Sequence, residues 1–178
     1  DVPITKLTSS EYAKQLIKTL NFDEATPSLS LKPVGEPSGS GTDTTHFSIL
    51  DKEGNRVAAT LSVNYLFGSC FVVPGTGFLL NDEMDDFSAK PGVPNAYGLI
   101  GAEANAIEPN KRPLSSMSPT FIEDNRGIAI LGTPGGSRII SMLLLGALEY
   151  ASGADAKTIV DTPRFHHQYM PDFVMYEN

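Results

Sequence analysis

The sequence has 178 residues, of which 40% are hydrophobic and 19% charged, a composition typical of one globular domain and not of a disordered or fibrous chain. Its 21 acidic and 13 basic residues give a net charge of −8, which argues against nucleic acids and anionic membrane surfaces as partners. The longest apolar run, Ile139 to Leu148, is far shorter than the roughly 20 residues that a bilayer requires, so no membrane-spanning segment is predicted. A small polar substrate is the better expectation.

The start of the chain combines a helix with a segment of low hydrophobicity. Thr8-Ser9-Ser10-Glu11 is a capping box, and the apolar residues after it recur at helical spacing, which predicts an amphipathic helix over residues 9–20. Residues 26–43 are rich in proline, glycine and serine and contain too few apolar groups to fold alone. We therefore expect an exposed, mobile segment before Thr44.

A β-hairpin is predicted directly after this segment. Two runs rich in β-branched and apolar residues, His46–Asp51 and Arg56–Tyr65, are separated by a short polar turn that contains a glycine. A short apolar strand, Gly77–Leu80, is then expected to lead into the acidic loop Asn81–Asp86.

The second half of the chain predicts a long loop, a second hairpin and two helices. Residues 88–113 have little periodicity, and a loop of that length is usually functional. The hairpin strands are expected at Pro119–Ile122 and Gly127–Leu131, and the helices at Arg138–Tyr150 and Asp155–Val160. This order of elements favours an α+β fold with helices packed on antiparallel sheet.

Thr44 stands where the mobile segment meets the first strand. A threonine hydroxyl is a weak nucleophile that needs a base, and a free α-amine on the same residue can supply one. That amine exists only if the bond between Asp43 and Thr44 is cut. From the local sequence alone, the better interpretation is that Thr44 and Thr45 only open a strand, because threonine is common there.

Five segments of the chain weigh against that simple interpretation. They are Thr44–Ser48, Leu79–Ser88, Arg112–Thr120, Gly132–Ser137 and Pro163–Gln168. In order and spacing they resemble small-subunit motifs of the γ-glutamyltransferase family. The resemblance covers nearly all of residues 44–178, the expected catalytic small subunit, while residues 1–43 resemble the end of the large subunit. It implies autocleavage before Thr44 and an αββα sandwich of the N-terminal-nucleophile hydrolases, partial here because the large subunit and the C-terminal strands are missing.

The resemblance also implies catalytic roles. Thr44 is expected to attack the γ-glutamyl amide, and Ser62 stands where the family usually has a second threonine that supports the nucleophile. A serine keeps the hydroxyl but loses the methyl group that restricts χ1. Gly135 and Gly136 are expected to bind the oxyanion through their amides at the start of a helix. The plainer alternatives are an ordinary strand serine and a turn formed by two glycines.

Substrate-binding roles follow from the same resemblance. Asn64, Glu83 and Asp86 are expected to accept hydrogen bonds from the α-ammonium group of the glutamyl moiety, and Ser115 and Ser116 to donate to its α-carboxylate. Two neutral hydroxyls hold a carboxylate weakly in water, so an arginine of the family's large subunit is expected to assist. Without the resemblance, a solvated acidic turn and two turn serines are the plainer interpretations.

One tyrosine and two histidines are further candidate site residues. Tyr97, in the long loop, stands where some bacterial members of the family carry a lid residue, although an aromatic that only pins the loop is an equally good interpretation. His166 and His167 are adjacent on an extended chain and therefore face opposite sides, so a structural role is favoured over a shared metal ion. No metal and no organic cofactor are expected.

The implied activity is γ-glutamyl transfer and hydrolysis through a Thr44 acyl-enzyme. Glutathione or another γ-glutamyl amide is the expected donor, with water, an amino acid or a peptide as acceptor. Two alternatives stay open: a related acylase or capsule γ-glutamyl transferase, and an inactive fragment that acts only in folding or association. This chain alone is expected to be inactive, with the large subunit of the same precursor as its partner. A periplasmic or secreted location is expected, with any signal peptide upstream.

Overall fold

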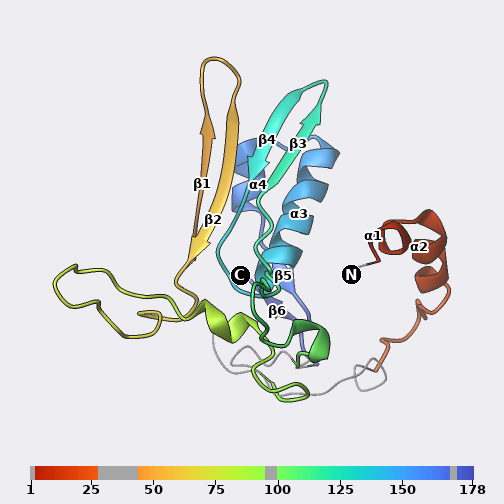
Figure 1. Cartoon of the computed structure of the whole chain (residues 1–178). Helices are drawn as coiled ribbons and strands as arrows, with labels where there is room; N and C mark the ends of the chain where they lie inside the picture. The colour runs from red at the N-terminus through yellow and green to blue at the C-terminus, as the bar shows by residue number, and fades with distance from the viewer. Residues whose placement is uncertain (1–2, 28–43, 95–99, 169–171) are drawn as a thin grey trace. The chain divides into compact units, whose positions relative to one another are not determined.

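The structure is a computed structural model that describes residues 3–27, 44–94, 100–168 and 172–178 (Figure 1). The chain divides into two compact units, Asp1–Pro33 and Val34–Asn178. Most of the segment predicted to be mobile, residues 26–43, and the candidate lid residue Tyr97 lie outside the described residues. A subunit boundary before Thr44 therefore stays a prediction.

The first unit contains two short helices, α1 (Ile4–Leu7) and α2 (Ser10–Ile17). The predicted amphipathic helix is present, but its N-cap is Ser9, one residue later than the capping box suggested. The hydroxyl of Thr8 instead donates to the carbonyl of Ile4 at 2.9 Å and closes α1, which the sequence did not predict. Helix α2 also ends before residue 20, because the amides that follow it bond three residues back and tighten the turn.

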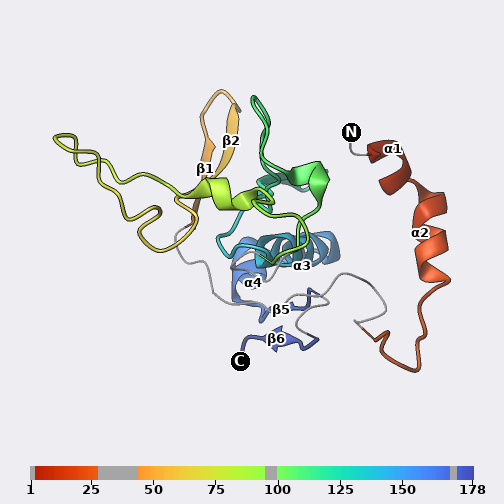
Figure 2. The same ribbon diagram turned by 60° about the horizontal axis from the view of Figure 1, so that its bottom comes forward.

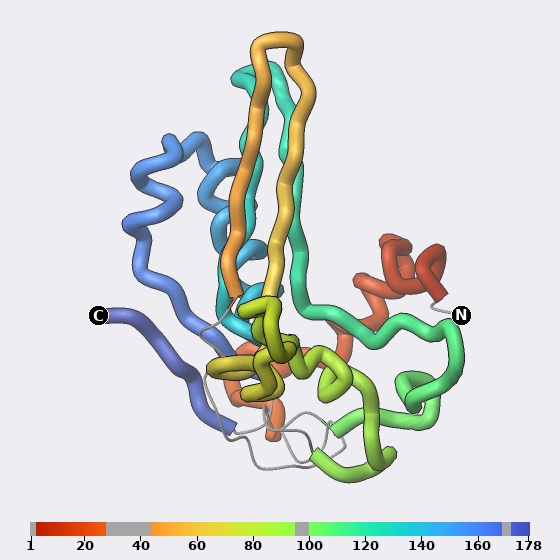
Figure 3. Tube along the Cα trace, turned by 60° about the vertical axis from the view of Figure 1, so that its left-hand side comes forward, coloured from red at the N-terminus to blue at the C-terminus, as the bar shows by residue number. Residues whose placement is uncertain are grey.

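The second unit contains both predicted hairpins. Strand β1 (Thr44–Leu50) pairs with β2 (Arg56–Ser62), and β3 (Thr120–Asp124) pairs with β4 (Gly127–Leu131), all antiparallel. The hairpins lie side by side (Figures 1 and 3). The ion pair between Arg56 Nη1 and a Glu123 carboxylate oxygen, 2.9 Å apart, joins them near their tips.

One predicted strand is wrong. Residues Gly77–Leu80 contribute a single isolated bridge, between Leu79 and Val72, in place of a strand. Gly77 has φ of 73°, a left-handed conformation that interrupts extended pairing. A short sheet that the sequence did not predict, β5 (Phe165–His166) with β6 (Met175–Tyr176), lies near the end of the chain.

Helix α3 (Arg138–Ser152) follows the second hairpin and packs beside β4, and α4 (Ala156–Asp161) packs against α3 (Figures 1 and 2). Gly153 ends α3 in a left-handed conformation with φ of 98°, so the helix extends to Ser152, two residues beyond the predicted end at Tyr150. Asp155 caps α4 by accepting a hydrogen bond from the amide of Thr158 at 2.8 Å. Among the described residues, no helix is both long and apolar enough to cross a bilayer.

The α+β class is confirmed, with three two-stranded antiparallel sheets among the described residues. The resemblance implies an αββα sandwich, and the described residues contain two hairpins and two helices of that architecture. Ile139, at the start of α3, is 1% exposed and is the most deeply buried large side chain described. It also borders the candidate site, so the core and the site share one wall.

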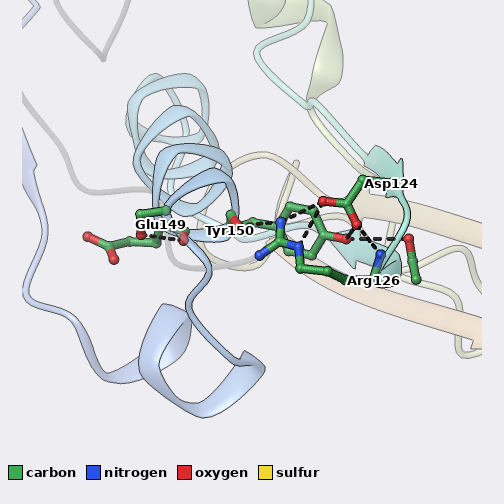
Figure 4. Close-up of polar contacts among 6 residues, drawn as sticks. Asp124, Arg126, Glu149 and Tyr150 are labelled. Atoms are coloured by element: carbon green, nitrogen blue, oxygen red, sulfur yellow. Dashed lines mark hydrogen bonds and ion pairs between the residues drawn. The ribbon is translucent and has the colours of Figure 1, made fainter.

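A polar cluster fastens the tip of hairpin β3–β4 to the end of α3 (Figure 4). Arg126 Nη2 donates to the Tyr150 carbonyl at 2.7 Å and to Asp124 Oδ2 at 2.6 Å. The guanidinium also lies 4.2 Å from the centre of the Tyr150 ring, and the Tyr150 hydroxyl donates to Asp124 Oδ1 at 2.9 Å. A cation at a helix C-terminus stabilises its unpaired carbonyls. Hydrogen bonds from Arg126 lower the pKa of Asp124 to about 2.

We predict that Arg126→Ala speeds amide hydrogen exchange in the last turn of α3, because the helix end loses its cation. Lys52→Ala at the tip of the other hairpin, where Lys52 pairs only with its neighbour Glu53 among the described residues, is the matched control. Because the pKa of Asp124 is lowered, the stabilisation that its carboxylate gives the cluster is fully present above about pH 4 and is lost as the pH falls through about 2. Equal rates of amide hydrogen exchange in the last turn of α3 in the two variants at neutral pH would show that Arg126 does not stabilise this helix end.

Candidate functional site

Two hydroxyl groups meet at the open end of hairpin β1–β2. The register pairs Thr44, the first residue of β1, with Ser62, the last residue of β2. Directly paired residues point to the same face of a sheet, and the two hydroxyl oxygens are 3.0 Å apart. Ser62 Oγ also accepts a hydrogen bond from the Asn64 amide at 2.8 Å. Ser62 is therefore turned to Thr44 and is not a solvent-facing strand residue.

The chain turns sharply after β2 and meets the acidic loop. Asn64 has φ of 73° and is 6% exposed, and its Nδ2 donates to the Asp82 carbonyl at 3.4 Å. Asp82 Oδ1 accepts from the Tyr65 amide at 3.1 Å, and the Asp82 amide donates to the Val63 carbonyl at 3.2 Å. The Tyr65 hydroxyl donates to Asp85 Oδ2 at 2.5 Å. These contacts fix the acidic loop against the end of β2.

The acidic loop contains the short 3-10 helix η2 (Glu83–Asp86), whose first and last residues are predicted site residues. Burial raises the pKa of Asp86 to about 7, and a hydrogen bond with Glu83 and repulsion from the neighbouring carboxylates add to the shift. Glu83 Oε1 is buried with no hydrogen-bond partner among the described residues. A buried carboxyl group whose pKa is raised, with a second carboxyl group beside it, is a favourable place for an incoming cation.

The serine pair lies on another wall of the site. Ser116 Oγ donates to the Gly136 carbonyl at 2.9 Å, so its proton is engaged within the protein. Ser115 Oγ accepts from the Met117 amide at 3.1 Å, and among the described residues its own proton has no acceptor. Ser115 is therefore the better placed of the two to donate to an anionic ligand, whereas Ser116 orients the glycine loop.

The glycine loop precedes α3 and presents the Gly136 amide away from the helix. The carbonyls of Gly135 and Gly136 accept from the amides of Arg138 and Ile139, each at 3.1 Å. Because a trans peptide places its N–H opposite its carbonyl, the Gly136 amide points away from α3. Neither glycine amide donates to another described residue. Both glycines have positive φ, 137° and 58°, which residues with a Cβ rarely adopt.

The predicted site residues converge. One pocket is lined by twelve described residues: Thr44, Ser62, Asn64, Glu83, Asp86, Leu114, Ser115, Ser116, Met117, Gly136, Ser137 and Ile139. Every predicted site residue is among them except Gly135, which lies outside the lining, and Tyr97, which lies outside the described residues. Segments that are distant in sequence thus place hydroxyl, carboxyl and amide groups around one small space.

A partly buried hydrogen-bond network that the sequence did not predict supports the start of α3. Ser137 Oγ donates to Gln168 Oε1 at 2.6 Å, and His166 Nε2 lies 3.0 Å from the same oxygen. His166 Nδ1 lies 2.6 Å from Ser141 Oγ, and His166 is 5% exposed. Both ring nitrogens are therefore engaged within the protein, in agreement with the predicted structural role of this histidine.

A contact of His46 joins β1 to the segment that leads into the glycine loop. His46 lies on the same face of β1 as Thr44, with Nδ1 2.9 Å from Thr60 Oγ1 and Nε2 3.1 Å from Ser48 Oγ. A Cβ at Gly132 would lie 1.9 Å from His46 Nδ1, so the ring packs directly on the backbone there. The alternation along β1 could have indicated which face His46 occupies, but not what it contacts.

Comparison with known proteins agrees with the resemblance found in the sequence. The family model described as gamma-glutamyltranspeptidase matches residues 1–178. The chain is 49% identical over 172 residues to the glutathione hydrolase proenzyme of Pseudomonas sp. (strain A14), which covers 96% of this chain and 30% of that protein. It is 46% identical over 175 residues to the glutathione hydrolase proenzyme of Escherichia coli (strain K12), with coverage of 96% and 30%.

A solved structure agrees as well. The crystal structure of a mutant of the Helicobacter pylori gamma-glutamyltranspeptidase has a TM-score of 0.71 and 49% identity, and the match covers 75% of this chain and 73% of that one. The chain spans about 30% of the length of the curated relatives named above.

We predict that Gly132→Ala destabilises the protein by about 1–3 kcal/mol, because the new methyl group overpacks against the His46 ring. The double variant Gly132→Ala with His46→Ala should recover part of that loss, as urea denaturation of the complete protein can measure. Gly146→Ala is the matched control, since a Cβ there meets its nearest neighbour at an ordinary 3.5 Å. Strictly additive effects of the two substitutions would show that the ring and the glycine are not coupled.

Proposed function

Because the chain belongs to the gamma-glutamyltranspeptidase family, we propose that it carries the nucleophile of an enzyme that transfers and hydrolyses γ-glutamyl groups. The observation that carries this proposal is the approach of the Thr44 and Ser62 hydroxyls to 3.0 Å in a pocket lined by carboxyl, hydroxyl and amide groups. Relatives named glutathione hydrolase proenzyme favour glutathione, over a capsule polymer or another acylase substrate, as the donor.

The nucleophile is prepared by cleavage of the chain. Thr44 Oγ1 attacks the carbonyl carbon of Asp43, and the peptide nitrogen leaves as the α-amine of Thr44. Water then hydrolyses the resulting ester and releases the Asp43 carboxylate and the free hydroxyl. The products are residues 1–43, as the end of a large subunit, and residues 44–178, within the small subunit. The word proenzyme in the names of the relatives supports this step.

Catalysis then proceeds in two acyl transfers. The Thr44 α-amine accepts the proton of Thr44 Oγ1 as that oxygen attacks the γ-carbonyl of the donor. The amides of Gly135 and Gly136 stabilise the oxyanion, and the protonated amine gives its proton to the leaving amine. Water or the amine of an amino acid or peptide acceptor then attacks the Thr44 ester. Ser62 holds the nucleophile in place through its hydroxyl.

Recognition of the glutamyl group is divided between two walls of the pocket. Asn64, Glu83 and Asp86 accept hydrogen bonds from the α-ammonium group, and Ser115 donates to the α-carboxylate, with Ser116 beside it. None of the described lining residues is a lysine or arginine. The cation that would strengthen carboxylate binding is therefore assigned to an arginine of the large subunit. Tyr97 is proposed as a lid residue, and a periplasmic or secreted location rests on the family alone.

Thr44→Ala in the complete precursor should abolish both cleavage and hydrolysis of L-γ-glutamyl-p-nitroanilide, with a loss of roughly 10⁴-fold or more in kcat. Thr44→Ser keeps a hydroxyl and should retain measurable cleavage and activity. Intact-mass measurement reports cleavage, and release of p-nitroaniline reports hydrolysis. Undiminished maturation and turnover in the alanine variant would overturn the proposed function.

Ionisation of Asp86 should appear in the pH profile. The raised pKa means that the carboxylate form, which binds the ammonium group, increases as the pH rises through about 7, so kcat/KM should rise there in the wild type. Glu83→Gln removes the principal repelling charge and should move this rise to lower pH. The α-amine of Thr44 has an ordinary pKa of about 7.7–8.0, and a rise caused by its titration should stay at the same pH in the Glu83→Gln variant. A profile that stays unmoved in the glutamine variant would exclude Asp86 as the titrating group.

A further inference from the structure

We propose that Gln168 is a positioning residue for the acyl transfer, because it accepts a hydrogen bond from Ser137 and thereby keeps Gly135 and Gly136 where their amides bind the oxyanion. This inference rests on the proposed function. Gln168 follows β5 and is not among the described residues that line the pocket, so it acts through another residue. Ser137 is that residue, since it lines the pocket and directly follows Gly136.

The hydroxyl of Ser137 does not cap the helix that it precedes. Ser137 is the N-cap residue of α3, with φ of −61° and ψ of −21°, and its side chain makes no capping hydrogen bond among the described residues. A serine in this place ordinarily accepts a hydrogen bond from an amide of the first helical turn. Here the hydroxyl donates to Gln168 Oε1 at 2.6 Å, and the carbonyls of the two glycines accept from the first helical amides. The glycine loop and the start of α3 therefore form one unit, to which Gln168 is attached.

The amide oxygen of Gln168 is itself fixed by a buried histidine. His166 Nε2 lies 3.0 Å from Gln168 Oε1, and because an amide oxygen can only accept, Nε2 is the protonated nitrogen in this contact. His166 Nδ1 lies 2.6 Å from the hydroxyl of Ser141, which belongs to the first turns of α3. The oxygen that receives the Ser137 proton is thus held to α3 by a second route, which limits its movement.

The glycine loop needs support from its neighbours because a glycine backbone is the least restrained of all. Gly135 and Gly136 both have positive φ, and Ser116 Oγ holds the Gly136 carbonyl at 2.9 Å. Gln168 holds the next residue, Ser137, from the opposite end of the peptide that joins it to Gly136. Oxyanion donors act only at hydrogen-bond distance, and a misplacement of about 1 Å can cost roughly a hundredfold in rate. Loss of this support should therefore lower the rate and leave substrate binding intact.

The test uses the complete, matured protein with L-γ-glutamyl-p-nitroanilide. Gln168→Met keeps the length of the side chain and removes the amide oxygen. Its kcat should fall roughly tenfold or more while KM stays within about twofold, because the oxyanion forms only in the transition state. A glutamate analogue with a boronic acid in place of the γ-carboxyl group adds the Thr44 oxygen to boron and becomes a tetrahedral anion. Its affinity should weaken by the same factor as kcat.

Ser137→Ala removes the same hydrogen bond from its other end and should also lower kcat. The double variant with Gln168→Met should be no slower than the slower single variant, because the two substitutions remove one shared interaction. His167→Gln is the matched control. His167 is the exposed neighbour of Gln168, its Nε2 lies 3.3 Å from Asp172 Oδ1, and its substitution should change neither kcat nor the affinity for the boronic acid.

A Gln168→Met variant that matches His167→Gln in kcat and in affinity for the boronic acid overturns the proposal, even if it is less stable, because the bond then only fastens β5 to α3. Additive losses in the double variant overturn it as well. If Gln168→Met does not mature, Ser137→Ala carries the comparison, and an unchanged kcat there has the same meaning. A wild-type protein that matures but does not hydrolyse the anilide refutes the proposed function, whereas an active wild type with unaffected Gln168 and Ser137 variants refutes this inference alone.

Discussion

The register of hairpin β1–β2 is the constraint on which the candidate site depends. It pairs the first residue of β1 with the last residue of β2 and thereby places the hydroxyl of Thr44 beside that of Ser62. A shift by one residue would turn Thr44 to the opposite face of the hairpin. The packing of His46 on Gly132 lies on the same face, so the register also determines how β1 meets the segment that leads into the glycine loop.

The four carboxyl groups of the acidic loop divide into a structural pair and a pair that faces the pocket. Asp82 and Asp85 accept hydrogen bonds from the amide and the hydroxyl of Tyr65, which satisfies them within the protein. Glu83 and Asp86 line the pocket, where burial and mutual repulsion raise the pKa of Asp86. The first pair thus holds the second pair in an arrangement that is costly without a cation.

Much of the fold could be predicted from sequence because hairpins and helices leave local patterns. The two runs rich in β-branched and apolar residues that form β1 and β2, and the helical stretches that form α3 and α4, are examples. The strand expected at Gly77–Leu80 was wrong because apolar content does not reveal a positive φ. The pocket lining followed from motif resemblance, whereas the hydrogen bond between Ser137 and Gln168 joins segments distant in sequence, which no local pattern records. Tyr97 remains a prediction.

Asn64 combines two demands that few amino acids meet together. Its left-handed backbone is unfavourable for most side chains, and asparagine is one of the residues that tolerates it best. Its buried carboxamide also contacts the acidic loop. Glycine would suit the backbone but would remove the carboxamide, and aspartate would add negative charge beside carboxylates. Substitution of Asn64 is therefore costly in either direction: glycine relieves the backbone but removes a polar group from the pocket, and another polar side chain strains the backbone or changes the charge.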